Sequence, residues 1–397
     1  MTTGQIDTIA YMTYAGSIPS RNADAVCVMN MCSSLAAQGS SVELVIPKGQ
    51  ALGMQALQFQ GTLWELYGLP ENFSIRYFSN PFDRFNSALR KNGYAFLALC
   101  YALLSGKQLI NARHIELSMM AARFGRPFVF EAHNFVKPAA SKFFPRFIEC
   151  LNKPGCRGAI VTTTQAGRDS FIDAGVPESR IAVLPNGVQV HRYEGLPSKD
   201  QLRKKLQLPA SKTIACFSGN LYAGRGIENI IHCAKKFQDI YFLIIGGGPE
   251  DVGRYAHMAA TGDIKNLHFT GYIPGTGIPP YLKAADILLM PNTAQSNVHS
   301  MAYTSPMKMF DYLAAGKPII VSDFPVLREI FTHQHNAFLV PADSAAEFAR
   351  GVEWVLENPV AAEKMAAQAR SDSLQYSWEK RAATYLSFVK ALLWKKN

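Results

Sequence analysis

Short apolar segments alternate with helix-sized intervals along most of the chain. The first series of apolar segments covers residues 8–13, 42–46, 75–78, 109–112, 128–131, 159–163 and 181–185. The second series covers residues 213–217, 241–245, 267–270, 287–290, 319–321 and 338–340. Strands that alternate with helices in this way predict an α/β fold, in which parallel sheets are covered by helices on both faces.

The two series of segments predict two domains. A charged stretch at residues 198–205 separates them, and 397 residues are too many for one ordinary core. We expect doubly wound, Rossmann-like domains at residues 1–190 and 191–377. Ligands bind at the carboxyl ends of such strands, so the two domains are expected to face a common cleft. An apolar stripe within residues 378–397 predicts a last helix that docks on a domain.

Composition favours a folded cytoplasmic protein. Apolar residues make up 48% of the chain, and its seven cysteines form no C-x-x-C pair, which is typical of reduced thiols. The first residues lack the basic and apolar regions of a signal peptide. The longest apolar run, residues 94–104, is shorter than the roughly 20 residues that a membrane span needs.

Positive charge is concentrated in one segment. Residues 84–157 carry 12 lysines and arginines against 3 glutamates, which is +9 of the chain's net +10. Such a segment attracts phosphates, nucleic acids or an anionic membrane, and no nucleic-acid motif accompanies it. We therefore expect contact with phosphate groups or with an anionic membrane surface. The cations that we expect at this contact are Arg113, Lys137, Lys142 and Arg146.

An aromatic stripe lies inside the basic segment. Phe143, Phe144 and Phe147 alternate with lysines and arginines, a pattern that is typical of helices in a membrane interface. The alternative is an ordinary domain helix with a solvated basic face. We favour the membrane contact because of the charge of the surrounding segment.

The most informative motif runs from Ser305 to Asp323. It predicts a helix that is opened by Pro306 and stopped by Gly316, followed by a buried strand. The helix N-terminus and Lys308 supply positive charge, and Asp311 can accept hydrogen bonds from vicinal hydroxyl groups. The motif therefore predicts a site for a nucleotide diphosphate.

Glycine turns follow several predicted strands. Residues 219–226 contain Arg225, which suits phosphate oxygens, and residues 246–248 form a second turn. Gly16 lies in a similar loop and lets backbone amides approach a ligand. Each turn alone is also compatible with a purely structural role, and residues 246–248 are a weaker signal than residues 219–226. The chain has no G-x-G-x-x-G, P-loop or Asp-x-Asp motif, so we expect neither a dinucleotide cofactor nor a metal ion.

Two polar residues end the predicted strand at residues 128–131. The two-residue period of a strand places Glu131 and His133 on the same side. A lone histidine is more often structural than functional, so His133 is a candidate only in this context.

In the order and spacing of these motifs, the chain resembles the family 4 glycosyltransferases, which are retaining enzymes of the GT-B fold. The resemblance covers nearly the whole chain and is strongest at residues 217–329. It implies that the C-terminal domain binds a sugar nucleotide, that the N-terminal domain binds the acceptor, and that the last helix crosses back.

The resemblance also implies roles for single residues. Arg225 and Lys308 would contact the donor diphosphate, Asp311 the ribose hydroxyls, and His133 the transferred sugar. The full set of donor-binding residues that we expect is Gly16, Gly219, Asn220, Gly247, Gly248, Tyr303, Ser305, Pro306, Met309, Phe310 and Asp311, with His133, Arg225 and Lys308 as catalytic residues.

Three positions depart from the family pattern. Tyr303 stands where the family often has a glutamate that reads the donor sugar, Asn220 replaces a usual arginine, and Asp311 replaces a glutamate. Sugar recognition must therefore differ, Arg225 must carry more of the phosphate charge, and Asp311 reaches less far toward the ribose.

These observations predict a metal-independent, retaining glycosyltransferase. We expect a nucleotide-diphosphate sugar as donor, with a weak preference for UDP, and a glycan or lipid-linked acceptor in surface polysaccharide biosynthesis. We expect the departing phosphate to accept the proton of the acceptor, and His133 to orient the sugar. The alternatives are a nucleotide-sugar epimerase or phosphorylase on the same fold, and a non-catalytic protein that binds sugar nucleotides.

Overall fold

The computed structural model describes residues 6–14, 18–48, 59–79, 87–133, 143–294, 303 and 305–393. The chain divides into two compact units, which we call unit 1 (Met1–Asn186 and Trp378–Asn397) and unit 2 (Gly187–Ser377). The division falls after Asn186, where the sequence led us to expect it after residue 190. Among the predicted site residues, Gly16, Lys137 and Lys142 lie outside the described residues.

Unit 1 is built on a parallel sheet of seven strands in the order β3-β2-β1-β4-β5-β6-β7. The strand order reverses between β1 and β4, which is the switch point of a doubly wound fold. Its elements are β1 (Thr8–Met12), α1 (Ala23–Ala37), β2 (Ser41–Pro47), α2 (Leu63–Tyr67), β3 (Ser74–Phe78), α3 (Ser87–Leu104), β4 (Leu109–Ala112), α4 (Ile115–Arg123), β5 (Phe128–Ala132), α5 (Phe144–Asn152), β6 (Gly158–Thr162), α6 (Gln165–Asp173), β7 (Ile181–Val183) and α16 (Trp378–Leu393).

Unit 2 repeats the plan with six parallel strands in the order β10-β9-β8-β11-β12-β13. Here the order reverses between β8 and β11. Its elements are the 3-10 helix η3 (Val190–Tyr193), α7 (Lys199–Lys205), β8 (Ile214–Ser218), α8 (Ile227–Lys236), β9 (Tyr241–Ile245), α9 (Pro249–Thr261), β10 (Leu267–Gly271), α10 (Ile278–Ala284), β11 (Ile287–Met290), α12 (Lys308–Ala315), β12 (Ile319–Asp323), α13 (Pro325–Arg328), β13 (Phe338–Pro341), α14 (Ala345–Glu357) and α15 (Pro359–Ser373).

The two-residue period of β8 shows why the sheet of unit 2 is covered on both faces. Ile214 and Cys216 join the apolar cluster that contains residues of α10, α12 and α15. Ala215 and Phe217 join the cluster on the other face, with residues of α8, α9 and α14. These parallel sheets with helices on both faces confirm the predicted α/β fold with two doubly wound domains.

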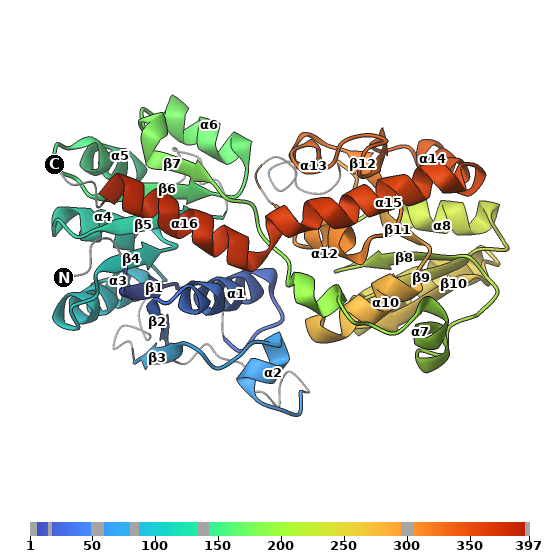
Figure 1. Cartoon of the computed structure of the whole chain (residues 1–397), viewed down its shortest axis with the longest axis horizontal. Helices are drawn as coiled ribbons and strands as arrows, with labels where there is room; N and C mark the ends of the chain where they lie inside the picture. The colour runs from blue at the N-terminus through green and yellow to red at the C-terminus, as the bar shows by residue number, and fades with distance from the viewer. Residues whose placement is uncertain are drawn as a thin grey trace. The chain divides into compact units, whose positions relative to one another are not determined.

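The last helix packs on unit 1, as the resemblance implied. Helix α16, drawn in red in Figure 1, contacts α1 and β6. Its apolar stripe is buried, with Trp378 at 2% exposure and Tyr385 at 0%. The chain thus leaves unit 1 after Asn186 and returns to it at Trp378.

The predicted aromatic membrane stripe on α5 is wrong. Phe144 and Phe147 are 2% and 0% exposed and belong to the core cluster of unit 1, and Phe143 packs against that cluster. Arg146, on the same helix, is exposed. The helix therefore follows the alternative interpretation, an ordinary domain helix with a solvated basic face. Among the described residues, no helix combines the length and the apolar composition that a membrane crossing requires.

Candidate active site

Several of the predicted donor residues lie near the switch point of unit 2. Gly219 follows β8 directly, and Pro291 follows β11. In doubly wound sheets, ligands bind outside the carboxyl ends of the strands at this point. Helix α12 begins in the connection that leads from β11 to β12, so the same edge also receives Lys308.

Tyr312 fixes helix α12 to both strands of the switch point. Its hydroxyl group accepts a hydrogen bond from the Ser218 N–H (2.8 Å) and donates one to the Leu289 carbonyl (3.1 Å). Tyr312 is completely buried. Because Lys308 precedes it by four residues, both side chains project from the same face of the helix. Sequence analysis missed this tyrosine, because its hydrogen-bond partners are 94 and 23 residues away in the sequence.

The helix begins at Lys308, two residues later than the predicted start at Pro306. The Met309 N–H donates to the Pro306 carbonyl (3.2 Å), and the Phe310 N–H donates to the Met307 carbonyl (3.1 Å). These bonds span three residues, so the first turn is tighter than an α-helical turn. The backbone amides of Met309 and Phe310, two predicted donor-binding residues, are thus bonded within the first turn of the helix. The side chains of Met309 and Phe310 lie in the core.

The ammonium group of Lys308 is buried and has no hydrogen-bond partner among the described residues. It lies 4.0 Å from the centre of the Phe217 ring. Burial, and secondly the charge of Arg225, hold the pKa of Lys308 well below its ordinary value. A Cβ atom on Gly219 would lie 3.3 Å from Nζ, so the glycine keeps the space above the ammonium open.

Arg225 is the second cation at this edge. Its side chain is half-buried, and burial lowers its pKa. The structure gives it no carboxylate partner among the described residues. Two neighbouring cations without anionic partners repel each other and pay a desolvation cost. An anion that binds between them removes both penalties.

The glycines of residues 219–226 shape this loop. Gly226 has φ +74°, and a Cβ atom there would overlap the carbonyl oxygen of Pro291. The loop is closed by a hydrogen bond from the Thr293 N–H to the Gly224 carbonyl (3.0 Å). Only glycine permits this close approach of the β8 loop to the end of β11. Asn220, in the same loop, is exposed.

The second glycine turn lies beside the first. A Cβ atom on Gly246 would overlap the Gly219 carbonyl, and one on Gly247 would meet the side chain of Leu221. These two glycines therefore serve the packing of the two turns. Gly248 is the N-cap residue of helix α9, and a Cβ atom there would meet nothing within 4 Å, so it is the residue of this turn with room for a ligand.

Asp311 lies one turn after Lys308 and faces a residue that sequence analysis missed. Its Oδ1 accepts a hydrogen bond from the Tyr193 hydroxyl group (2.8 Å), which comes from η3. Burial raises the pKa of Asp311 to about 6, and the Tyr193 hydrogen bond and the charge of Arg192 only partly offset this. Of the other predicted donor residues, Ser305 is buried, and Tyr303 and Pro306 are half-buried.

In unit 1, Glu131 and His133 are in contact, as the strand period predicted. His133 Nε2 lies 2.9 Å from Glu131 Oε1. Glu131 is almost fully buried and also binds Arg381 of α16. Burial lowers the pKa of His133, and the charge of Arg113 acts in the same direction.

Arg113 lies in the interior rather than on a surface. Its NH2 group pairs with Asp24 Oδ1 at 2.6 Å, and its side chain is 4% exposed. A guanidinium group in this position does not reach a lipid surface, so the prediction that Arg113 contacts a membrane is wrong. Its charge acts instead on His133 and Glu131.

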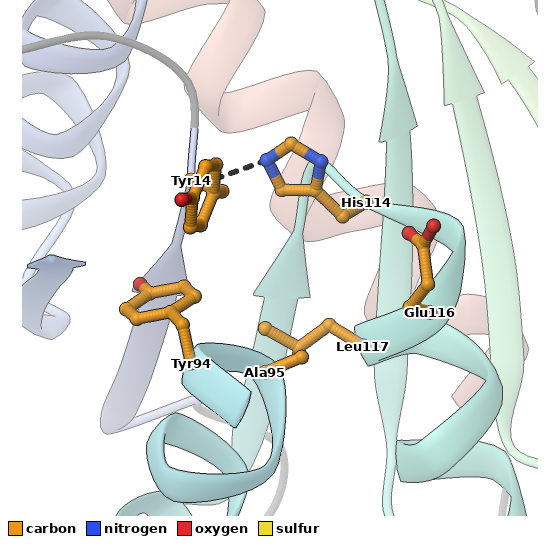
Figure 2. Close-up of a pocket in the computed structure, with 6 residues that line it drawn as sticks. All are labelled: Tyr14, Tyr94, Ala95, His114, Glu116 and Leu117. Carbon is orange, nitrogen blue, oxygen red and sulfur yellow. Dashed lines mark hydrogen bonds between the residues drawn. The ribbon is translucent and has the colours of Figure 1, made fainter. Parts of the chain in front are cut away.

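A small pocket lies at the switch point of unit 1 (Figure 2). Its lining comes from the loop after β1, from α3 and from the start of α4. The His114 ring accepts a hydrogen bond at Nε2 from the Tyr14 N–H (2.8 Å). Sequence analysis did not find this pocket. Its lining residues are Tyr14, Tyr94, Ala95, His114, Glu116 and Leu117.

The part of the chain that the structure describes contains no group of three or more histidine, cysteine, aspartate and glutamate side chains with the geometry of a metal site.

Comparison with known proteins agrees with this architecture. The chain matches the family model "Glycosyltransferase Family 4" at residues 25–192 and the model "Glycosyl transferases group 1" at residues 198–372. The two models together cover most of the chain, and the protein therefore belongs to the family 4 glycosyltransferases of the GT-B fold.

Two relatives and one solved structure illustrate the similarity. The chain is 28% identical over 221 residues to the 2-deoxystreptamine glucosyltransferase of Streptomyces kanamyceticus, an alignment of 53% of this chain and 55% of that protein. It is 22% identical over 226 residues to the alpha-galactosylglucosyldiacylglycerol synthase of Streptococcus pneumoniae, with 55% and 57% covered. The chain thus spans about half the length of the curated relatives that it matches.

The similarity to the crystal structure of Anabaena Alr3699/HepE in complex with UDP extends over the whole fold. The TM-score is 0.74, and the alignment covers 97% of this chain and 100% of that one. The sequences are 17% identical, so this likeness concerns the fold.

Proposed function

We propose that this chain is a retaining glycosyltransferase that moves a sugar from a nucleotide-diphosphate donor to a hydroxyl group of a glycan or lipid-linked acceptor. The observation that carries the proposal is the pair formed by Lys308 and Arg225. Both cations lie at the switch point of unit 2 without an anionic partner among the described residues, and the Lys308 ammonium is buried. A diphosphate supplies the charge that this pair lacks.

In the proposed reaction, the bond between the anomeric carbon and the β-phosphate oxygen breaks, and its electron pair stays on the phosphate. The acceptor oxygen forms the new bond on the same face of the sugar, and its proton passes to a phosphate oxygen. Lys308 and Arg225 stabilise the charge that develops on the leaving group. Because the two cations provide this stabilisation from side chains, we propose that no metal ion is needed.

Asp311 is assigned to the ribose of the donor. An ionised carboxylate accepts hydrogen bonds from both vicinal hydroxyl groups, and Tyr193 holds one of its oxygens in place. His133 is assigned to orient the transferred sugar.

The pocket of unit 1 is our candidate for one part of the acceptor. Two tyrosine rings and a histidine ring line the pocket, and aromatic rings suit the C–H groups of a sugar. The Glu116 carboxylate, which has no partner among the described residues, suits its hydroxyl groups. The pocket is small, so it would hold a single small substituent of a sugar, such as a hydroxyl group, rather than a whole ring or glycan.

We propose that the acceptor is a growing surface glycan on a lipid carrier and that the protein contacts the inner face of the membrane through its basic segment. The net charge of +9 at residues 84–157 supports this, as does the similarity to a glycolipid synthase. With the aromatic stripe buried, the contact would be electrostatic. The protein should co-sediment with vesicles that contain anionic lipid at low salt and be released at high salt. Failure to bind at low salt would contradict the proposed membrane contact.

The test of the donor assignment is a comparison of UDP-, GDP-, dTDP- and ADP-sugars as thermal stabilisers. The Anabaena structure with the same fold holds UDP, which makes UDP-sugars the first to test. We expect a UDP-sugar to raise the melting temperature most, equally with and without EDTA, and uridine to have no effect. If no sugar nucleotide stabilises the protein, the proposal fails. If a sugar nucleotide does stabilise the protein, analysis of the product distinguishes a retaining transferase from an epimerase. The transferase needs an acceptor and keeps the configuration of the anomeric carbon.

A further inference from the structure

One oxygen of Glu131 is shared by two side chains from distant parts of the sequence. Oε1 lies 2.8 Å from the NH2 group of Arg381 on α16 and 2.9 Å from His133 Nε2. The side chains of Glu131 and Arg381 are only 1% and 3% exposed. The ion pair is therefore shielded from water, and its charges act strongly on the histidine.

The other oxygen of Glu131 is also occupied. Oε2 accepts hydrogen bonds from the Tyr11 hydroxyl group and from Asn111 Nδ2, the latter at 3.1 Å. The Asn111 side chain in turn accepts a hydrogen bond from the Tyr385 hydroxyl group (2.7 Å). Both oxygens thus have fixed partners, and α16 holds the network at two points.

This arrangement determines which nitrogen of His133 carries the proton. An ionised carboxylate only accepts hydrogen bonds, so the proton lies on Nε2 and Nδ1 is left with a lone pair. Glu131 stays ionised, because Arg381, His133 and Arg113 together outweigh the cost of its burial and hold its pKa well below the ordinary value.

We propose that Arg381 is a positioning residue for His133, which neutralises and orients Glu131 so that the ring stays neutral with its proton on Nε2 and its Nδ1 free to accept a sugar hydroxyl. The sugar contact rests on the proposed function, whereas the state of the ring does not. Arg381 Nε also donates to the Pro185 carbonyl (2.9 Å), immediately before the chain leaves unit 1. The state of His133 thus depends on the docking of the last helix.

The charges that face His133 give the expected effect of removing Arg381. Glu131 on β5 favours the protonated ring, while Arg113 after β4, Arg381 on α16 and burial disfavour it. Without Arg381, the carboxylate keeps fewer cationic partners, so the His133–Glu131 pair should take up a proton at higher pH. Conversely, Glu131→Gln removes the group that favours the charged ring, so the pKa of His133 should fall further.

The experiment is NMR of protein with ¹⁵N-labelled histidine, in which the signal lost in His133→Gln identifies the ring. We expect wild type to show the Nε2–H tautomer. Arg381→Met should shift the titration of the His133–Glu131 pair upward by about one pH unit or more. Glu131→Gln should lower the pKa of the His133 ring. Arg381→Lys, which keeps the charge, should stay closer to wild type than Arg381→Met.

Two control variants separate this role from a structural one. Tyr385→Phe removes the second hydrogen bond of α16 to the network without changing charge, and Lys380→Met removes an exposed cation of the same helix. Tyr385→Phe should lower the melting temperature, and both controls should leave the titration of His133 unchanged.

An unchanged titration and tautomer in folded Arg381→Met would overturn the inference. If this variant does not fold, Arg381→Gln decides in the same way, since an upward shift of the titration supports the inference and no shift overturns it. In the profile of transfer rate against pH, Arg381→Met should move the fall in rate on the acid side to a higher pH. At high pH the variant should transfer at the wild-type rate. If the ring titration moves and transfer does not respond, the inference stands and the assigned role of His133 fails.

Discussion

The Lys308 ammonium lies 4.0 Å from the centre of the Phe217 ring, and Phe217 is completely buried. The ring face stabilises a cation, but less than an anionic partner does. Tyr312 fixes helix α12, and with it Lys308, to the strands. Gly219 has no side chain that would fill the space above Nζ. The ammonium is thus prepared for an anion before one binds.

Proton uptake should accompany the binding of UDP. Burial and Arg225 hold the pKa of Lys308 well below its ordinary value in the free protein, and a nearby diphosphate should raise it. Between these two pKa values, the complex holds a proton on Lys308 that the free protein lacks. Titration calorimetry at a series of pH values, in two buffers of different ionisation enthalpy, measures this uptake. Lys308→Met should abolish it, and equal uptake by this variant would exclude Lys308 as the source.

Asp311 should make the stability of the protein depend on pH. Its pKa is raised from 3.8 to about 6, so the folded state disfavours the ionised form. The contribution of Asp311 to stability is therefore full below about pH 4 and is lost as the pH rises through about 6. Asp311→Asn should melt at a higher temperature than wild type at pH 8 and show a smaller difference at pH 4. Asp200→Asn, at an exposed position, is the control. A constant difference between Asp311→Asn and wild type would contradict this.

Two glycines of the site should respond differently to alanine. A Cβ atom on Gly226 overlaps the Pro291 carbonyl, and the residue has a positive φ, whereas a Cβ atom on Gly248 meets nothing within 4 Å. We expect Gly226→Ala to reduce the free energy of unfolding by about 1–3 kcal/mol and Gly248→Ala to leave it nearly unchanged. Urea denaturation measures both, and equal stability of the two variants would show that the loop relaxes.

The pocket of unit 1 should bind sugars through Glu116. Saturation-transfer NMR with a panel of monosaccharides tests this without knowledge of the acceptor. At least one sugar should give a signal that Glu116→Gln weakens severalfold, because the carboxylate accepts from hydroxyl groups more strongly than an amide does. Glu149→Gln, on the exposed side of α5, should have no effect. Equal signals from the two variants would contradict the assignment of this pocket to the acceptor.

The sequence predicted the parts of the molecule that depend on local pattern. The strands at Leu109–Ala112, Tyr241–Ile245 and Ile287–Met290 have the predicted bounds, and Gly316 ends α12 in the left-handed conformation. Local periodicity and turn chemistry suffice for these features.

Contacts between distant residues could not be predicted in this way. The Tyr193–Asp311 hydrogen bond spans 118 residues, and the Arg381–Glu131 bond spans 250. Neither pair belongs to a common motif, and only the tertiary fold brings the two residues of each pair together. The stripe of Phe144 and Phe147 shows the same limit, because a helical period marks an apolar face without showing whether protein or lipid covers it.

The most direct test of the account is the affinity of UDP for Lys308→Met and Arg225→Met, measured by calorimetry in the presence of EDTA. Lys235→Met, which removes an exposed cation from α8, is the matched control. We expect each of the two site variants to bind UDP at least about tenfold more weakly than wild type, because a charge-assisted hydrogen bond contributes about 1.5–3 kcal/mol. The control should bind as wild type does. Wild-type affinity in both site variants would contradict the assignment of Lys308 and Arg225 to the donor diphosphate.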